Sequence, residues 1–483
     1  MKVLLKIVEK GQHMNKKMKL RLVAILVLVS LLVPTGTVES LAANPTNATA
    51  LNYEIIRTAT TGYFTMCEST VQEKLTSSCY VTDQYKGTCT ATVDAKSYDV
   101  VKTIPELQAL SNARATGILN YIKSVDLRVM SWNTYIGEPT NVVFSDNGEV
   151  NCEVYIWTEF EWCNSDFPKP MQSGYGTLHT LTLTSDLQVI SDQFDEQDIS
   201  GINTRTDTTV KENGNIAPRS IIPSESITPY VLPASGPNQL INRSSVVTYA
   251  NQYVGNYSGS APATQDYTHY NRKYINFNYD GGDCVNYVSQ CLNNAGLPQT
   301  SNWYYRENGT SCTNSSHEAN NNTSLTSHSC TANDSCSASW SDTDSFITVM
   351  CSAYPSDYDT SPTAGEFCVG DVGFLCNGSN GAGPRHAFIC VGTGSSTFLI
   401  NAHNNDRKNV AYNNGMISDL NIIRVHIHSP SSAWLKYDSY YHYAPCNAGC
   451  GYNYYGIHYA QVPSQNGTCL GCGYVGNIPS GMS

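Results

Sequence analysis

Apolar residues recur at helical spacing in three stretches of the chain. The first runs from Pro105 to Val125, and the second begins directly after Asn242-Arg243. Residues three and four positions apart lie on one face of a helix, so each stretch predicts a helix with a buried face. The third stretch follows Asp283, which is a typical N-cap residue, and ends at Gly296, a typical C-cap. Its apolar positions are Cys284, Tyr287, Val288, Cys291, Leu292 and Ala295.

Other segments have the patterns of strands. From Cys152 to Trp162, apolar and polar residues alternate, which predicts a half-buried antiparallel strand. Thr177–Thr184 and Leu187–Ser191 are separated by Ser185-Asp186 and predict a hairpin. In the second half of the chain, strands are predicted at Gly370–Leu375, His386–Val391, Thr397–His403 and Asn421–Ile427. These elements together predict an α+β protein.

A chain of 483 residues is too long for one core, and its composition changes along its length. Basic residues precede an apolar run from Leu22 to Val33, and Ser40-Leu41-Ala42 is typical of a cleavage site. A Ser/Thr-rich stretch that contains several proline residues predicts a linker. A later Ser/Thr/Asn-rich stretch predicts a surface insertion. The expected organisation is a signal peptide at 1–42, an N-terminal α+β domain at 43–200, a linker at 201–238, a second domain at 239–435 with an insertion at 306–345, and a Cys-rich tail at 436–483.

Removing residues 1–42 removes seven Lys/Arg and two Glu, which leaves 21 positive and 38 negative side chains, a net charge of −17. Such an acidic protein is a poor partner for nucleic acid or an anionic membrane. With its signal peptide removed, the protein is expected to be secreted, either extracellular or associated with the cell wall, with no contact to the membrane. Its 18 cysteines fit an oxidising compartment, where several disulfides are expected. Cys67, Cys79, Cys89, Cys152 and Cys163 are expected to staple the N-terminal domain.

The tail contains two pairs of closely spaced cysteines, each followed by glycine. Cys446 and Cys450 form the first pair, and Cys469 and Cys472 form the second. This spacing is typical of a zinc ribbon, in which four thiolates bind a structural zinc ion, and two disulfides are the alternative. His442 and His458 are alternative ligands.

Cys284 is the candidate nucleophile. In the first turn of its helix, the helix dipole favours a thiolate, and free backbone N–H groups can hold an oxyanion. A cysteine nucleophile needs a base and a group that orients the base. His386 begins a strand, and the next strand ends in Asn401-Ala402-His403. If these strands are antiparallel neighbours, Asn401 and His403 come close to His386. A buried or disulfide-bonded cysteine is the alternative for Cys284. Catalysis itself is expected to need no cofactor.

Several motifs resemble the amidase-like domain of exported bacterial proteins. They are Asn242-Arg243, the run Gly-Gly-Asp-Cys-x-Asn-x-x-Ser-Gln-Cys-Leu at 281–292, Trp303-Tyr304-Tyr305, Gly370-Asp371, Arg385-His386 and Ala402-His403. This family is similar to the papain-like cysteine peptidases and amidases that act on cell walls. The resemblance covers about residues 240–430.

The resemblance implies a papain-like hydrolase domain, preceded by a small α+β domain with a cone-like sheet. Cys284 is then the nucleophile, His386 the general base and His403 the third residue, with Asn401 as the alternative. Trp303 and Tyr304 would line the substrate groove, although a core role fits them as well. The implied activity is amide hydrolysis, with peptidoglycan peptide as the expected substrate. An extracellular protein-degrading protease and a non-catalytic surface or adhesion protein are the alternatives.

Overall fold

A computed structural model describes the chain from the first long helix to the tail. It covers residues 45–91, 104–204, 240–255, 270–271, 273–274, 277, 283–306, 335–376, 383–431, 434–437, 441–457, 467–468 and 475–476. The chain divides into two units, residues 1–56 and 57–483. The signal peptide, the linker and most of the insertion predicted above lie outside the described residues. No helix in the described part of the chain is long and apolar enough to cross a membrane.

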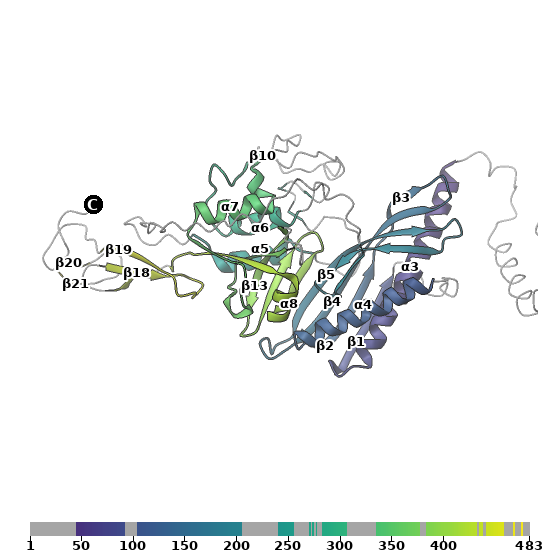
Figure 1. Ribbon diagram of the computed structural model, residues 1–483, viewed down its shortest axis with the longest axis horizontal. Coiled ribbons are helices and arrows are strands. Elements are labelled where there is room, and N and C mark those ends of the chain that lie inside the picture. The colour runs from purple at the N-terminus through teal and green to yellow at the C-terminus, as the bar shows by residue number, and fades with distance from the viewer. Residues whose placement is uncertain are drawn as a thin grey trace, which may run out of the picture. The chain divides into compact units, whose positions relative to one another are not determined.

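The fold is a mixed α+β structure (Figure 1). In the described residues its α-helices are α3 (Pro45–Thr76), α4 (Pro105–Ser124), α5 (Arg243–Gln252), α6 (Cys284–Asn294), α7 (Thr343–Ala353) and α8 (Asn414–Leu420). The predicted helices at 105–125, after Asn242 and after Asp283 correspond to α4, α5 and α6. Helix α3 has no counterpart among the predicted elements.

Most strands belong to one twelve-stranded sheet with the order β1-β2-β4-β5-β15-β14-β13-β12-β16-β11, to which β3 and β6 are added at β4 and β5. Strands β1 and β2 are parallel, and the other pairs are antiparallel. The N-terminal strands are β1 (Val81–Ala91), β2 (Arg128–Ile136), β3 (Thr140–Phe144), β4 (Val150–Cys163), β5 (Met171–Leu183) and β6 (Val189–Gln193). The others are β11 (Ser356–Asp359), β12 (Val372–Cys376), β13 (Pro384–Thr393), β14 (Thr397–Ala402), β15 (Arg407–Asn413) and β16 (Ile422–Ile427).

Short strands lie outside this sheet. β7 pairs with β8, β9 with β10 and β20 with β21, and β18 lies between β17 and β19 in a three-stranded sheet. Their bounds are β7 (Asp195–Glu196), β8 (Ile202–Asn203), β9 (Tyr305–Arg306), β10 (Ser335–Cys336), β17 (Leu435–Lys436), β18 (Tyr441–Pro445), β19 (Asn453–Ile457), β20 (Gly467–Thr468) and β21 (Val475–Gly476).

The predicted strands are confirmed, and so is the hairpin, formed by β5 and β6. Strand β15 was missed, and it connects the two halves of the sheet. Arg407 of β15 pairs with Tyr175 of β5, so the N-terminal region and the region around Cys284 share one hydrogen-bonded sheet. A side-chain hydrogen bond also crosses this junction. Tyr121 of α4 donates it to the backbone carbonyl of Ala411 in β15 at 3.1 Å.

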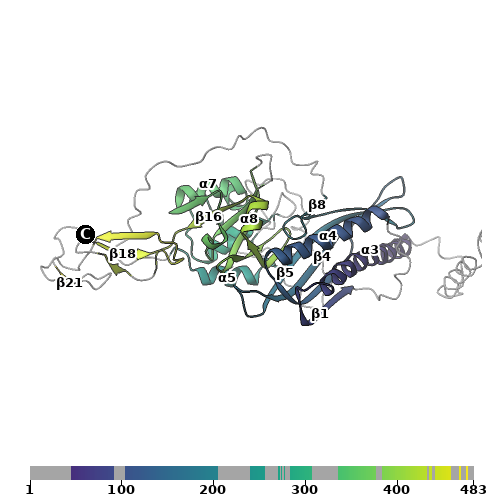
Figure 2. The ribbon, with the colours of Figure 1, turned by 60° about the horizontal axis from the view of Figure 1, so that its bottom comes forward.

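Helices cover the sheet and bury its apolar side chains. Helices α3 and α4 lie along strands β1, β2, β4 and β5 (Figures 1 and 2), and Val71 and Ile118 share a core with Trp132 and Phe160. Helices α5, α6 and α7 each contact β13. Helix α6 is buried along almost its whole length, from Cys284 to Leu292.

The cysteines differ from the expectation of a disulfide-stapled domain. Cys67, Cys79, Cys152 and Cys163 are free thiols, and the side chain of Cys89 lies outside the described residues. Cys67 and Cys152 are buried within α3 and β4. A cysteine in such a place packs as a small apolar residue, which explains its burial without a disulfide.

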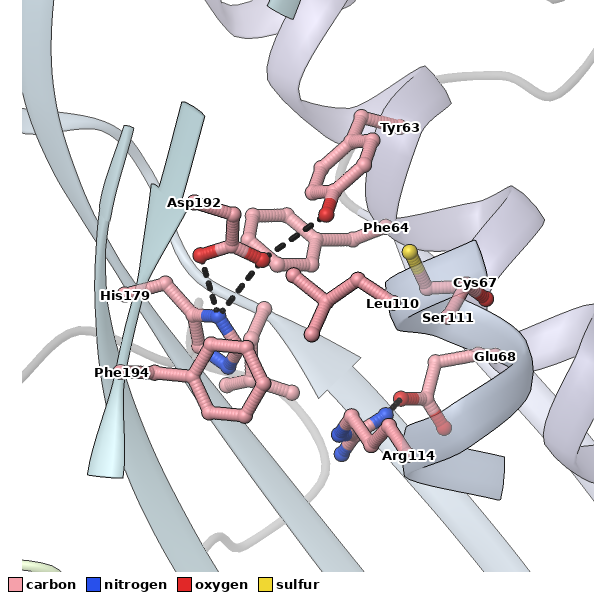
Figure 3. A pocket seen from close by; sticks show the side chains of 11 residues that line it. Tyr63, Phe64, Cys67, Glu68, Leu110, Ser111, Arg114, His179, Asp192 and Phe194 are labelled. Carbon is pink, nitrogen blue, oxygen red and sulfur yellow. Dashed lines mark hydrogen bonds and ion pairs between the residues drawn. The ribbon is translucent and has the colours of Figure 1, made fainter. Parts of the chain in front are cut away.

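A buried polar network links the helices of the N-terminal region to its sheet (Figure 3). Asp192 accepts hydrogen bonds from Tyr63 at 2.8 Å and contacts Nδ1 of His179 at 2.9 Å. Nearby, Arg114 pairs with Glu68 at 2.5 Å and with Glu196 at 2.8 Å. The cavity between these side chains has a volume of about 10 Å³, which is room for about one water molecule. A cavity this small cannot admit a substrate.

Candidate active site

Cys284 is the first residue of α6 and is buried. Its pKa is raised to about 11, mainly because burial disfavours the thiolate, and the neighbouring Asp283 carboxylate adds to this. Hydrogen bonding from the backbone of Ala387, Val285 and Cys284 itself opposes the rise. The expectation that the helix N-terminus would stabilise a thiolate is therefore outweighed by burial, and Cys284 is a neutral thiol at neutral pH.

The contact with Ala387 places the sulfur of Cys284 beside β13, next in sequence to His386. His386 is partly buried near the start of that strand. Its pKa is lowered to about 4, first by burial and then by the charges of Arg407 and Arg385, while Asp198 and Asp406 oppose the change. The imidazole is therefore neutral at neutral pH. A neutral thiol and a neutral imidazole are the resting states from which general-base activation begins.

His403 occupies a different position from the one expected of a third triad residue. Its Nδ1 lies 2.7 Å from Oδ2 of Asp283, and its Nε2 faces the carbonyl of Tyr253. The ring is stacked between Tyr270, at 3.5 Å between centroids, and Tyr287, at 3.9 Å. These contacts tie His403 to Asp283, the residue that precedes Cys284, and to the backbone of Tyr253.

Asp283 makes several hydrogen bonds and is not the simple N-cap that the sequence predicted. Its side chain makes no capping bond to α6. Instead, Oδ1 accepts hydrogen bonds from the backbone N–H of Phe277 at 2.9 Å and from the amide of Asn286 at 2.7 Å. Its own backbone N–H donates to the side chain of Asn404. These contacts fix the chain immediately before the candidate nucleophile.

Asn401 lies on β14, which is antiparallel to β13 as predicted, with Ile389 directly opposite Asn401. Its side chain accepts a 2.7 Å hydrogen bond from the backbone N–H of Asn409 and donates one of 3.0 Å to Asn251. In this position, Asn401 fastens β14 to β15 and α5.

Two carboxylates that were not singled out from the sequence act electrostatically on His386. Asp198 follows β7 and is held by Arg407 at 2.6 Å and by Tyr412 at 2.8 Å. Asp406 accepts hydrogen bonds from Tyr155 at 3.0 Å and Tyr270 at 2.9 Å. Asp198 is 188 positions before His386, in the N-terminal region, so no local spacing could reveal it. The N-terminal region thus contributes charge to the candidate site.

The two aromatic candidates for substrate binding have different environments. Trp303 is fully buried, stacks on Trp340 at 5.0 Å and donates a 3.1 Å hydrogen bond to Ser289. These contacts favour the core role that the sequence left open. Tyr304 is partly exposed, and the guanidinium of Arg306 lies 4.7 Å from its ring centroid.

The four predicted zinc ligands are only partly described. Cys469 and Cys472 lie outside the described residues. Cys446 and Cys450 come together at the end of β16, beside His426 and His428. The strand pattern predicted β16, but the two histidines carried no spacing signal that linked them to the cysteines.

The site and fold define an α+β protein with a buried cysteine at a helix N-terminus against a histidine-bearing strand. Residues 241–428 match the family model described as "Putative amidase domain". No curated protein and no solved structure matches the chain. The family match supports amide hydrolysis as the general activity.

Proposed function

We propose that the protein is a secreted cysteine amidase or peptidase with a papain-like catalytic domain, and that peptidoglycan peptide is its substrate. One observation carries the catalytic part of this proposal: the sulfur of Cys284 lies against the backbone beside His386, within the region that matches an amidase domain. Export and the cell-wall substrate rest on the predicted signal peptide and on the family resemblance.

In the proposed mechanism, neutral His386 removes the proton from the Cys284 thiol as the sulfur attacks the amide carbonyl. A new carbon–sulfur bond forms, and the carbonyl becomes a tetrahedral oxyanion. The backbone N–H of Cys284 at the start of α6 supplies part of the oxyanion hole. The imidazolium then returns the proton to the leaving amine, and the C–N bond breaks. Water, deprotonated by His386, hydrolyses the thioester and restores the thiol.

Asp198 and Asp406 have a supporting role in this mechanism. Their carboxylates favour the protonated form of His386, whereas Arg407 and burial disfavour it. The imidazolium that forms during attack is therefore stabilised by two fixed negative charges. His403 and Asp283 act as positioning residues, since they hold the backbone on which Cys284 lies.

The test compares the wild type with Cys284→Ala on purified bacterial cell wall. Released fragments and new amino groups are followed by mass spectrometry, and Cys291→Ala, which removes another buried thiol of α6, is the matched control. Fragments released by the wild type and the control, but not by Cys284→Ala, would support the proposal and identify the bond. Equal release by the wild type and Cys284→Ala would exclude cysteine catalysis. Cleavage of free proteins without release from cell wall would favour an extracellular protease.

A further inference from the structure

Four side chains with metal-binding atoms converge at the end of β16. They are His426, His428, Cys446 and Cys450, and their candidate ligand atoms all lie within 4.8 Å of one another. The Cys446 sulfur is 3.6 Å from Nε2 of His426, and the Cys450 sulfur is 3.4 Å from Nδ1 of His428. His426, His428 and Cys446 are buried, whereas Cys450 is exposed.

These separations fit a tetrahedral zinc ion. Zinc lies about 2.3 Å from cysteine sulfur and about 2.0–2.1 Å from histidine nitrogen, so a tetrahedral angle places sulfur and nitrogen about 3.6 Å apart. The two observed sulfur–nitrogen distances differ from that value by no more than 0.2 Å. Two cysteines and two histidines form one of the ligand sets of structural zinc.

The local backbone explains why the four residues meet. His426 and His428 are two positions apart along an extended segment, so their side chains lie on the same side. Cys446 follows β18 and forms a bridge with Pro430, which fixes it beside the histidines (β18 is labelled in Figure 2). The chain then turns back within four residues, with Gly449 at φ 74° and a 3.0 Å bond from its N–H to the Cys446 carbonyl. That turn brings Cys450 back to the same point.

Each histidine also has a carboxylate at its other ring nitrogen. Oδ1 of Asp371 lies 2.5 Å from Nδ1 of His426, and Oδ1 of Asp357 lies 3.2 Å from Nε2 of His428. The ring of Tyr452 stacks on His428 at 3.9 Å. A carboxylate behind a ligating histidine is the usual outer shell of a zinc site, because it fixes the tautomer and the ring orientation.

We propose that His426, His428, Cys446 and Cys450 bind one structural Zn²⁺ ion, which fastens the start of the tail to the amidase-like domain. Two ligands belong to the region matched by the family model, and two follow it. Because all four positions are filled by protein, the ion has no open position for a substrate. Two thiolates and two neutral imidazoles balance the charge of the ion.

The same cluster includes a second group, formed by Cys368, Asp371 and His426. Asp371 is already engaged by Arg424 at 3.4 Å, by the backbone N–H of Cys368 at 2.9 Å and by His426. A carboxylate with these partners serves better as an outer-shell group. The set of two cysteines and two histidines is therefore the better zinc site.

The metal site is separate from the candidate active site. Ile422 of β16 and His386 of β13 both pair with Leu375 of β12, so they lie in one row across the sheet. His426 is four residues further along β16, which is roughly 13 Å at the rise of a strand. Removing the metal therefore tests the zinc proposal independently of amide hydrolysis.

The experiment measures zinc in the full chain, purified without a metal-binding tag or chelator. We expect one zinc per chain by elemental mass spectrometry, and cobalt substitution should give the absorption of a tetrahedral site with thiolate ligands. Cys450→Ser and His428→Asn should each weaken zinc affinity at least tenfold in a chelator competition. The matched control, Cys469→Ser with Cys472→Ser, should bind zinc like the wild type. Circular dichroism confirms that each variant is folded.

Three outcomes would overturn the proposal. The wild type could contain no zinc and take up none after reduction, or the control could lose zinc, which would indicate a four-cysteine ribbon. Intact-mass and peptide analysis could also show a Cys446–Cys450 disulfide in the exported protein. Asp357→Asn gives an independent readout, since Asp357 is largely exposed and its loss should not prevent folding. We expect 10–100-fold weaker zinc binding in that variant, and unchanged affinity would contradict the outer-shell assignment.

Discussion

The carboxylate of Asp283 and the imidazole of His403 form a buried pair, with 2.7 Å between Oδ2 and Nδ1. The side chain of His403 is fully buried and that of Asp283 is 1% exposed, so neither group can replace its partner by water. The pair joins the residue before Cys284 to the end of β14. This contact favours a positioning role for His403 over the catalytic role that the sequence suggested.

Replacing His403 by Ala should lower the free energy of unfolding by about 3–5 kcal/mol, because it leaves the Asp283 carboxylate buried without the partner of its Oδ2 atom. Turnover should fall as well, since Asp283 fixes the backbone at Cys284. Urea unfolding and kcat measure the two effects. His179→Ala is the matched control, because His179 forms a similar buried pair with Asp192. It should lose stability and, while folded, keep its kcat. Full stability of the His403 variant would contradict this role.

The activity should depend on pH according to the states of Cys284 and His386. The pKa of His386 is lowered to about 4, so the base is protonated, and the rate lost, only as the pH falls through about 4. The pKa of Cys284 is raised to about 11, so the thiol keeps its proton across the neutral range. We therefore expect kcat/KM to be level from about pH 5 to 9.

The alkylation of Cys284 gives a second measure of this protonation state. Its rate with iodoacetamide should rise about tenfold for each pH unit near neutrality, because only the thiolate reacts. Peptide mass spectrometry separates Cys284 from the other free cysteines, and Cys291, which is buried in the same helix, is the internal control. A plateau in alkylation below pH 7 would show a pre-formed thiolate and contradict the neutral pair.

Arg114 should be essential to the stability of the N-terminal region. It is buried between Glu68 of α3 and Glu196 of β7, and its loss leaves two buried carboxylates without a cation. We expect Arg114→Ala to cost about 3–5 kcal/mol in urea unfolding. The control is Arg57→Ala, which removes a pair with Glu138 in which both side chains are 21% exposed. That change should cost about 1 kcal/mol or less. Equal losses of stability in the two variants would show that burial of the ion pair does not determine its contribution.

Gly117 tests the connection between the N-terminal region and His386. A Cβ atom at this position of α4 would lie 1.7 Å from the backbone oxygen of Ser200, two residues after Asp198. Gly117→Ala should therefore displace the segment that carries Asp198. We expect a loss of about 1–3 kcal/mol in stability and a lower kcat. Thr116→Ala, on the exposed side of the same helix, is the control and should change neither by much. A fully active and stable Gly117 variant would show that the segment adjusts freely.

The sequence by itself determined the elements whose patterns are local. The apolar spacing after Asp283 depends only on the helical repeat, and it identified α6 with Cys284 in its first position. The alternation in Cys152–Trp162 and the continuous apolar run after His386 identified β4 and β13 in the same way. The pairing of β13 with β14 followed from their order along the chain.

Tertiary structure decided which side chains meet, because those contacts join residues far apart in the sequence. It brought Asp198 into the electrostatic environment of His386. It also placed the two ring nitrogens of His403 beside the carboxylate of Asp283 and the carbonyl of Tyr253. It also joined Cys446 to His426 and Cys450 to His428, which are 20 and 22 positions apart. Burial, which no local pattern measures, decided the protonation of Cys284. A sequence lists the groups available for chemistry, but distance and desolvation arise only when the chain is folded.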